Sequence, residues 1–121
     1  MSIVWLTKRH YTHKDALSDR FGRVYELPYA WANAGERASL ELVDYRGRDA
    51  AYVQDGPLEI CSTPLRSPAA LGALRRRVIR ARPKVIVASG DCFMGLLAWR
   101  LSRSTGARFV FDVYDDYRAF G

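Results

Sequence analysis

Five short apolar runs recur along the chain, at residues 3–6, 38–43, 58–61, 85–88 and 109–113. They are rich in β-branched or aromatic residues and are separated by polar residues, Gly and Pro, which is the pattern typical of strands. Compact apolar strands joined by helical segments favour a parallel sheet, because such a sheet is buried on both faces. A shorter candidate strand, residues 51–53, lies within the polar stretch 44–55.

Three segments between these runs have apolar residues at helical spacing. The stripes are Val24, Leu27, Trp31 and Ala34; Leu71, Leu74, Val78 and Ile79; and Met94, Leu97, Ala98 and Leu101. Ser67 and Asp91 are suited to cap the second and third helices, and Gly35 and Gly106 to end the first and third. Pro28 is expected in the first turn of its helix or at a bend, because an interior proline costs about 3 kcal/mol.

The resulting order, βαββαβαβ, predicts a single α/β domain over residues 1–121. Its sheet is expected to be open, mostly parallel and Rossmann-like, with helices on both faces. Ligands of such sheets bind beyond the carboxyl ends of the strands. At those ends the chain places Lys8 and Arg9, the segment 89–91, and a polar stretch that begins at Asp112.

The formal net charge of the 121-residue chain is +6, and its sequence pI is about 9.7. This charge favours phosphorylated ligands, nucleic acid or an anionic membrane surface. Cys61 and Cys92 have neither metal-ligand nor redox spacing, so both are expected to be buried, reduced thiols. No run approaches the ~18 apolar residues of a membrane span, and the N-terminus does not have the form of a signal peptide. We therefore expect a cytoplasmic protein with at most peripheral contact at the inner face of the membrane.

Several of these segments together resemble a known family. They are the first strand with its long polar loop, the helix that ends at residues 33–36, and the stretches 22–27, 85–88, 104–107 and 109–115. In this pattern the chain is similar to the N-terminal domain of a GT-B glycosyltransferase, and more narrowly to the family-four group of retaining, sugar-nucleotide-dependent enzymes. The resemblance implies a domain that holds the acceptor, which is a hydroxyl of a glycan or a lipid-linked compound. A second, C-terminal Rossmann-like domain holds the nucleotide-sugar donor in such enzymes.

The resemblance also implies roles for particular residues. The loop after the first strand approaches the donor phosphate or the acceptor, which here involves Thr7, Lys8, Arg9, Gly22 and Arg23. The fifth strand of these enzymes commonly ends in a pattern that contains a catalytically important His. Tyr114 stands at that position here, followed by Asp115.

A second departure concerns the paired glutamates, eight positions apart, of the family's donor domain. No two glutamates of this chain have that spacing. We therefore expect the donor-binding domain to be absent from this chain and the chain alone to be inactive in sugar transfer.

These considerations define the expected site. The catalytic candidates are Tyr114, Asp115 and His13, and the substrate-binding candidates are Lys8, Arg9, Gly22, Arg23 and Asp91. His10 and His13 lie in a polar loop, where a histidine can deprotonate an acceptor hydroxyl or can simply be exposed to solvent. Asp91 can contact sugar hydroxyls or cap its helix, and Lys8 and Arg9 can bind a phosphate or form a solvated basic loop.

No metal or cofactor is expected. Asp91, Asp112, Asp115 and Asp116 provide hard oxygen ligands of the kind that Mg²⁺ or Ca²⁺ prefers. Acidic residues are, however, equally typical of helix caps and loop starts. The G-x-G-x-x-G pattern of dinucleotide sites does not follow the first strand,.

An arginine-rich surface is the remaining chemical feature. It consists of Arg75, Arg76, Arg77, Arg80, Arg82, Arg100, Arg103 and Arg108. Contact with an anionic membrane through Arg75, Arg76, Arg77 and Arg80 is one interpretation, and a solvated helix face is the other. Nucleic acid is the less favoured partner, because no aromatic residues interleave the run. Trp5, Trp31 and Trp99 lie on core-facing patterns and are expected to serve packing.

Two alternative functions stay open on the sequence alone. The first is a stand-alone flavodoxin-like or response-regulator-like module for binding or signalling, in which the acidic residues hold a cation or a phosphoryl group. The second is a nucleic-acid-binding protein, whose retention on nucleic acid would fall steeply with salt.

Overall fold

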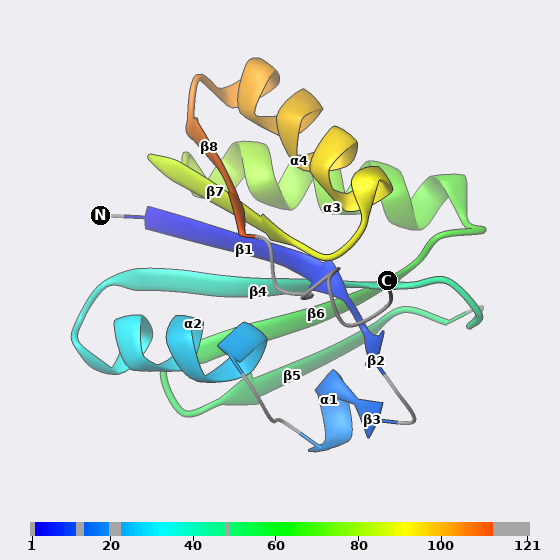
Figure 1. Cartoon of the computed structure of the whole chain (residues 1–121), viewed down its shortest axis with the longest axis horizontal. Helices are drawn as coiled ribbons and strands as arrows, with labels where there is room; N and C mark the ends of the chain where they lie inside the picture. The colour runs from blue at the N-terminus through cyan, green and yellow to red at the C-terminus, as the bar shows by residue number, and fades with distance from the viewer. Residues whose placement is uncertain (1, 12–13, 20–22, 48, 113–121) are drawn as a thin grey trace, which may run out of the picture.

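The computed structural model describes residues 2–11, 14–19, 23–47 and 49–112 (Figure 1). Within that part of the chain, six strands form one sheet in the order β5-β6-β4-β1-β7-β8. The strands are β1 (Ser2–Lys8), β4 (Arg37–Asp44), β5 (Ala51–Asp55), β6 (Leu58–Pro64), β7 (Val85–Ser89) and β8 (Arg108–Asp112). The helices are α1 (Ala16–Asp19), α2 (Arg23–Asn33), α3 (Pro68–Ala81) and α4 (Cys92–Thr105).

The sheet is parallel except at one edge, where β5 runs antiparallel to β6. Both strands of this hairpin were expected, and Gly56 supplies the positive φ of 57° in the turn between them. A small ribbon of β2 (His10–Tyr11) and β3 (Lys14–Asp15) follows β1, together with the single turn α1. The sequence pattern predicts only a loop here, because two-residue strands leave no periodicity to detect.

The five parallel strands follow the order 3-2-1-4-5 when they are numbered along the chain. This is the order of the Rossmann fold, whereas flavodoxin-like domains have the order 2-1-3-4-5. The prediction of an α/β domain with a mostly parallel, Rossmann-like sheet is therefore confirmed. The connections from β1 and from β7 lead to opposite sides of the sheet, so the topological switch point lies between these two neighbouring strands.

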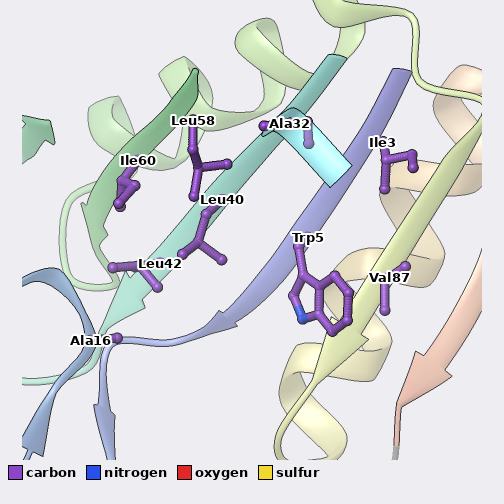
Figure 2. Close-up of a cluster of buried hydrophobic side chains, with 10 residues drawn as sticks. Ile3, Trp5, Ala16, Ala32, Leu40, Leu42, Leu58, Ile60 and Val87 are labelled. Atoms are coloured by element: carbon purple, nitrogen blue, oxygen red, sulfur yellow. The ribbon is translucent and has the colours of Figure 1, made fainter. Parts of the chain in front are cut away.

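Helices cover the sheet on both faces, with α2 on one side and α3 and α4 on the other (Figure 1). Successive side chains of a strand point to opposite faces, and β1 accordingly sends Trp5 toward α2 and Leu6 toward α3 and α4. Figure 2 shows the core on the α2 side, where Trp5 lies next to Val87 of β7 and the leucine and isoleucine side chains of β4 and β6 continue the cluster on its other side. Trp5 also packs against Trp31 of α2, with ring centroids 5.6 Å apart.

The helix ends follow the predicted signals. Ser67 accepts a hydrogen bond from the amide of Ala70 at 3.1 Å, and Asp91 accepts one from the amide of Met94 at 3.1 Å, so each caps its helix. Gly35, with a φ of 96°, ends α2 in a Schellman motif: its amide bonds to Ala32 and the next amide to Trp31,. These local signals set where each crossover starts and stops.

The face that α2 buries differs from the predicted one. Leu27 and Ala34 are exposed, whereas Pro28 and Ala32 are buried. Pro28 also lies in the interior of the helix, beyond its first turn, which leaves a bend as the other predicted setting for it. The physical reason is that Tyr29 packs on the core together with Ala32, which turns the buried stripe away from Leu27.

Three further expectations about burial are wrong. Trp99 is 46% exposed and Ile79 38% exposed, because both lie on the outward faces of their helices. Cys92 is exposed at the start of α4, while Cys61 is buried as predicted. Burial raises the pKa of the Cys61 thiol to about 11.

Candidate functional site

The candidate site lies where the carboxyl ends of β1, β4 and β7 meet. Thr7 of β1 lies opposite Ser89 of β7, and Lys8 lies opposite Val43 of β4. Trp5 donates a hydrogen bond from its indole nitrogen to the Ser89 hydroxyl at 2.9 Å. The same hydroxyl donates to Asp112 at the end of β8, at 3.2 Å. This chain of contacts fixes the ends of three neighbouring strands beneath the site.

Lys8, Tyr45 and Asp91 form a cluster at the switch point. The Tyr45 hydroxyl lies 3.1 Å from each carboxylate oxygen of Asp91 and donates to that carboxylate. The Lys8 ammonium lies 3.9 Å from the same carboxylate and 5.6 Å from the centre of the Tyr45 ring. The Tyr45 ring also meets the Phe93 ring in a T-shaped arrangement, at 6.0 Å between centroids. The side chain of Asp91 is 41% exposed, so its carboxylate is fixed in place and open to a ligand.

Arg9 forms a separate cluster next to the first. Its guanidinium donates to both oxygens of Asp15, at 2.8 and 2.9 Å, and to the Ser62 hydroxyl at 3.1 Å. It also lies 3.6 Å from the Asp44 carboxylate. The hydrogen bonds to Asp15 raise the pKa of Arg9, and the same bonds lower the pKa of Asp15. Arg9 therefore braces the segment after β1 against β4 and β6.

Asp44 links this brace to His10. The amides of Arg46 and Gly47 donate to one Asp44 oxygen at 3.0 and 2.9 Å, and His10 lies 3.6 Å from that carboxylate. Burial raises the pKa of Asp44, but the two amides and the charges of His10 and Arg9 outweigh it and hold the pKa below 3.8. A Cβ at Gly47 would collide with the carboxylate, so the turn requires glycine there.

A small cavity of about 110 Å³ opens between the two clusters. It is lined by Lys8, His10, Val43, Tyr45 and Arg46. Its polar lining is mostly cationic, so it suits a small anionic group or a sugar hydroxyl at the edge of a larger ligand.

The structure brings only some of the sequence candidates together. Lys8 and Asp91 meet directly, and Arg9 lies beside them with its guanidinium engaged by carboxylates. Arg23 is the first residue of α2. His13, Gly22, Tyr114 and Asp115 lie outside the described residues.

Tyr45, Asp15 and Asp44 are the residues that sequence reasoning missed. Asp44 and Tyr45 directly follow the carboxyl end of the predicted strand 38–43, so the rule that pointed to Lys8 and Asp91 applies to them equally. Asp15 had no such signal, because its partner Arg9 lies across a small ribbon that the sequence does not reveal.

The acidic residues do not form a metal-binding group in the part of the chain that the structure describes. No three His, Cys, Asp or Glu side chains are arranged there to hold an ion. Asp91 caps α4 and Asp112 accepts from Ser89, while Asp115 and Asp116 lie outside the described residues.

The strand order and the polar edge define the class: this chain is an α/β domain with Rossmann-like topology. It is similar to the C-terminal domain (residues 78–226) of a hydrogenase from Pyrococcus furiosus, with a TM-score of 0.52 and 11% sequence identity. The similarity covers 93% of this chain and 91% of that one. No protein-family model and no curated protein matches the sequence. At 11% identity the similarity bears on the fold and not on the activity.

Proposed function

We propose that this domain is the acceptor-binding, N-terminal half of a GT-B glycosyltransferase, which transfers a sugar from a nucleotide-sugar donor to a hydroxyl of a glycan or lipid-linked acceptor. The observation that carries the proposal is the cluster of Lys8, Tyr45 and Asp91 at the switch point. A fixed, exposed carboxylate can accept hydrogen bonds from two neighbouring sugar hydroxyls. The Tyr45 ring next to it offers an apolar surface for the face of a sugar ring.

The cationic lining of the small cavity supports the same proposal. Lys8 and Arg46 can attract a phosphate, either that of a lipid-linked acceptor or the leaving phosphate of the donor. His10 lies next to the Asp44 carboxylate, at 3.6 Å. A histidine held in this way can take the proton of an acceptor hydroxyl as that hydroxyl attacks.

Sugar transfer also requires a site for the nucleotide of the donor. In the enzymes that this chain resembles, a second Rossmann-like domain holds that nucleotide. We therefore propose that the present domain binds acceptor and acts only when joined to a donor domain. Tyr114, Asp115 and His13 stay predicted contributors to catalysis, and Gly22 and Arg23 predicted contributors to binding.

Saturation-transfer NMR with a panel of methyl glycosides and disaccharides tests acceptor binding. Asp91→Asn should weaken binding at least tenfold, because a hydrogen bond to a charged group contributes about 1.5–3 kcal/mol. Asparagine caps helices as well as aspartate does, so the variant should keep its fold, which its melting temperature checks. Asp49→Asn is the matched control, because Asp49 is an exposed carboxylate in the loop between β4 and β5.

Three results would overturn the proposal. The first is that no sugar of the panel binds, and the second is that the Asp49 and Asp91 variants bind the glycosides equally well. The third comes from isothermal titration with sugar nucleotides, for which we expect little binding. Tight binding that Lys8→Ala abolishes would place the donor, and not the acceptor, at this edge.

A further inference from the structure

Helices α3 and α4 lie side by side on one face of the sheet (Figure 1). Together they carry six arginines and neither an aspartate nor a glutamate. Solvated helices commonly pair basic residues with acidic ones three or four positions away, which keeps the two signs interspersed. This helical layer therefore presents positive charge with no acidic residue of its own to balance it.

One of the six arginines is turned away from this surface. Arg77 donates to both oxygens of the buried Glu41, at 2.9 and 3.1 Å, and to Thr63. Because its guanidinium is engaged by Glu41, Arg77 is not included in the surface proposed below. Arg80 also lines the hollow on the Arg77 side of α3.

Four further arginines are exposed: Arg75, Arg100 and Arg103 line the hollow between the two helices, and the Arg76 guanidinium lies next to Gly72 of the same hollow. None of them forms an ion pair with a carboxylate among the described residues. We call these four residues, together with Phe93, Leu96 and Trp99, the outer helical surface.

The same surface exposes large apolar side chains. Phe93 is 41%, Leu96 53% and Trp99 46% exposed. Their spacing, with Arg100 and Arg103, places them on one face of α4. The Arg103 guanidinium lies 5.7 Å from the centre of the Trp99 ring. Aromatic and aliphatic residues beside arginines on one helix face are the composition of helices that lie in a membrane interface.

An apolar groove of about 560 Å³ runs between α3 and α4. Leu71, Leu74 and Leu97 are among the residues that line it, and arginines 75, 100 and 103 form its cationic part. The groove thus combines an apolar floor with positive charge. An anionic phospholipid has the complementary arrangement, because its negative headgroup adjoins apolar acyl chains.

From this complementarity we propose that the outer helical surface docks on a bilayer that contains anionic phospholipid. The contact is peripheral, because within the described residues no helix is long and apolar enough to cross a membrane. Arginines contact the headgroup phosphates, and Phe93, Leu96 and Trp99 enter the interface beneath them. A nucleic-acid duplex would neutralise the arginines, but because its bases are stacked inside it would leave these three side chains without an apolar partner.

Flotation with vesicles tests the proposal. The protein should float with phosphatidylcholine vesicles that contain about 30% phosphatidylglycerol and should not float with pure phosphatidylcholine at about 0.1 M salt. Arg100→Gln/Arg103→Gln should bind the anionic vesicles about thirty-fold more weakly, which corresponds to about 2 kcal/mol for two basic residues. Leu96→Ser/Trp99→Ser should also weaken binding, although it leaves the charge unchanged.

The matched control removes two positive charges elsewhere. The variant Arg37→Gln/Lys84→Gln changes two exposed residues at the amino ends of the strands, outside the outer helical surface. This variant should bind anionic vesicles as the original protein does. Equal loss in this control would mean that net charge alone attracts the vesicles, and would overturn the proposal. Retention on duplex DNA without flotation would also overturn the proposal. A further contrary result would be a protein that does not float and is a dimer in solution, with Leu96→Ser/Trp99→Ser converting it to a monomer.

Discussion

The ion pair of Arg77 and Glu41 gives the sharpest prediction about stability. Glu41 is only 3% exposed. Burial raises the pKa of its carboxyl above 4.5, although the hydrogen bonds and charge of Arg77 lower it. Arg77→Met keeps an unbranched, although shorter, apolar chain in the hollow between α3 and the sheet, but it leaves the buried carboxylate without its cation. Breaking a buried pair in this way typically costs about 3–5 kcal/mol.

The carboxyl can limit this loss by taking up a proton. From its ordinary pKa of 4.5, protonation at about pH 7 costs about 1.36 kcal/mol per unit over about 2.5 units, which gives a ceiling of about 3.4 kcal/mol. At about pH 5 the same reasoning gives about 0.7 kcal/mol. In the variant the folded-state pKa of Glu41 lies above its unfolded value. The free energy of unfolding of the variant is therefore highest below the unfolded-state pKa of Glu41, and it falls as the pH rises through the folded-state pKa.

Urea unfolding at the two pH values measures this difference. Arg77→Met should lose about 2–3.4 kcal/mol at about pH 7 and less than about 1 kcal/mol at about pH 5, each relative to the original protein at that pH. Arg76→Met, the neighbouring exposed arginine, should stay within about 0.5 kcal/mol at both. An equal loss at both pH values would refute the reasoning, because it would show that packing, and not the unpaired charge, sets the cost.

Three further predictions follow from single sites. Gly95→Ala should destabilise the protein, because a Cβ there would meet an aromatic ring of β8 at 2.5 Å. Gly72→Ala should be neutral or stabilise the protein by up to about 1 kcal/mol, because its Cβ meets only a flexible guanidinium,. Thermal melts compare the two variants, and equal changes in melting temperature would contradict the close contact at Gly95. A thiol reagent at mildly alkaline pH should label Cys92 in the folded protein and Cys61 only after unfolding, since burial raises the pKa of Cys61 to about 11; rapid labelling of both would disprove the burial. Because the pKa of Asp44 is held below 3.8, the stability it contributes is present above its unfolded pKa and is lost as the pH falls. The free energy of unfolding of Asp44→Asn should therefore fall less steeply with decreasing pH than that of the original protein. An unchanged pH dependence would show that Asp44 does not contribute to acid unfolding.

Local patterns in the sequence were enough for the five parallel strands and the three long helices. Strand runs and helical periodicity are properties of neighbouring residues, as are the caps at Ser67 and Asp91 and the helix stop at Gly106. The order of those elements restricts the chain to an open, mostly parallel sheet. The location of the candidate site at the carboxyl edge follows from that topology, which is why Lys8 and Asp91 could be named in advance.

Only the tertiary structure decided which side chains meet at that edge. Tyr45 reaches Asp91 across 46 positions of sequence, and Arg9 reaches Ser62 across 53. Such contacts depend on how neighbouring strands align, and no local spacing encodes that alignment. The buried face of α2 and the exposure of Trp99 were likewise decided by tertiary packing, in this case by which face of each helix lies on the sheet.

The run of three arginines at residues 75–77 illustrates the division. Sequence alone determined that this helix is basic, amphipathic and packed on a parallel sheet. The structure decided that Arg75 and Arg76 are exposed and that Arg77 is paired with Glu41. Consecutive helical residues point about 100° apart, and a buried carboxylate on β4 lies within reach of only one of these directions. Whether each arginine is exposed or paired therefore depends on which residue of the sheet lies beneath it.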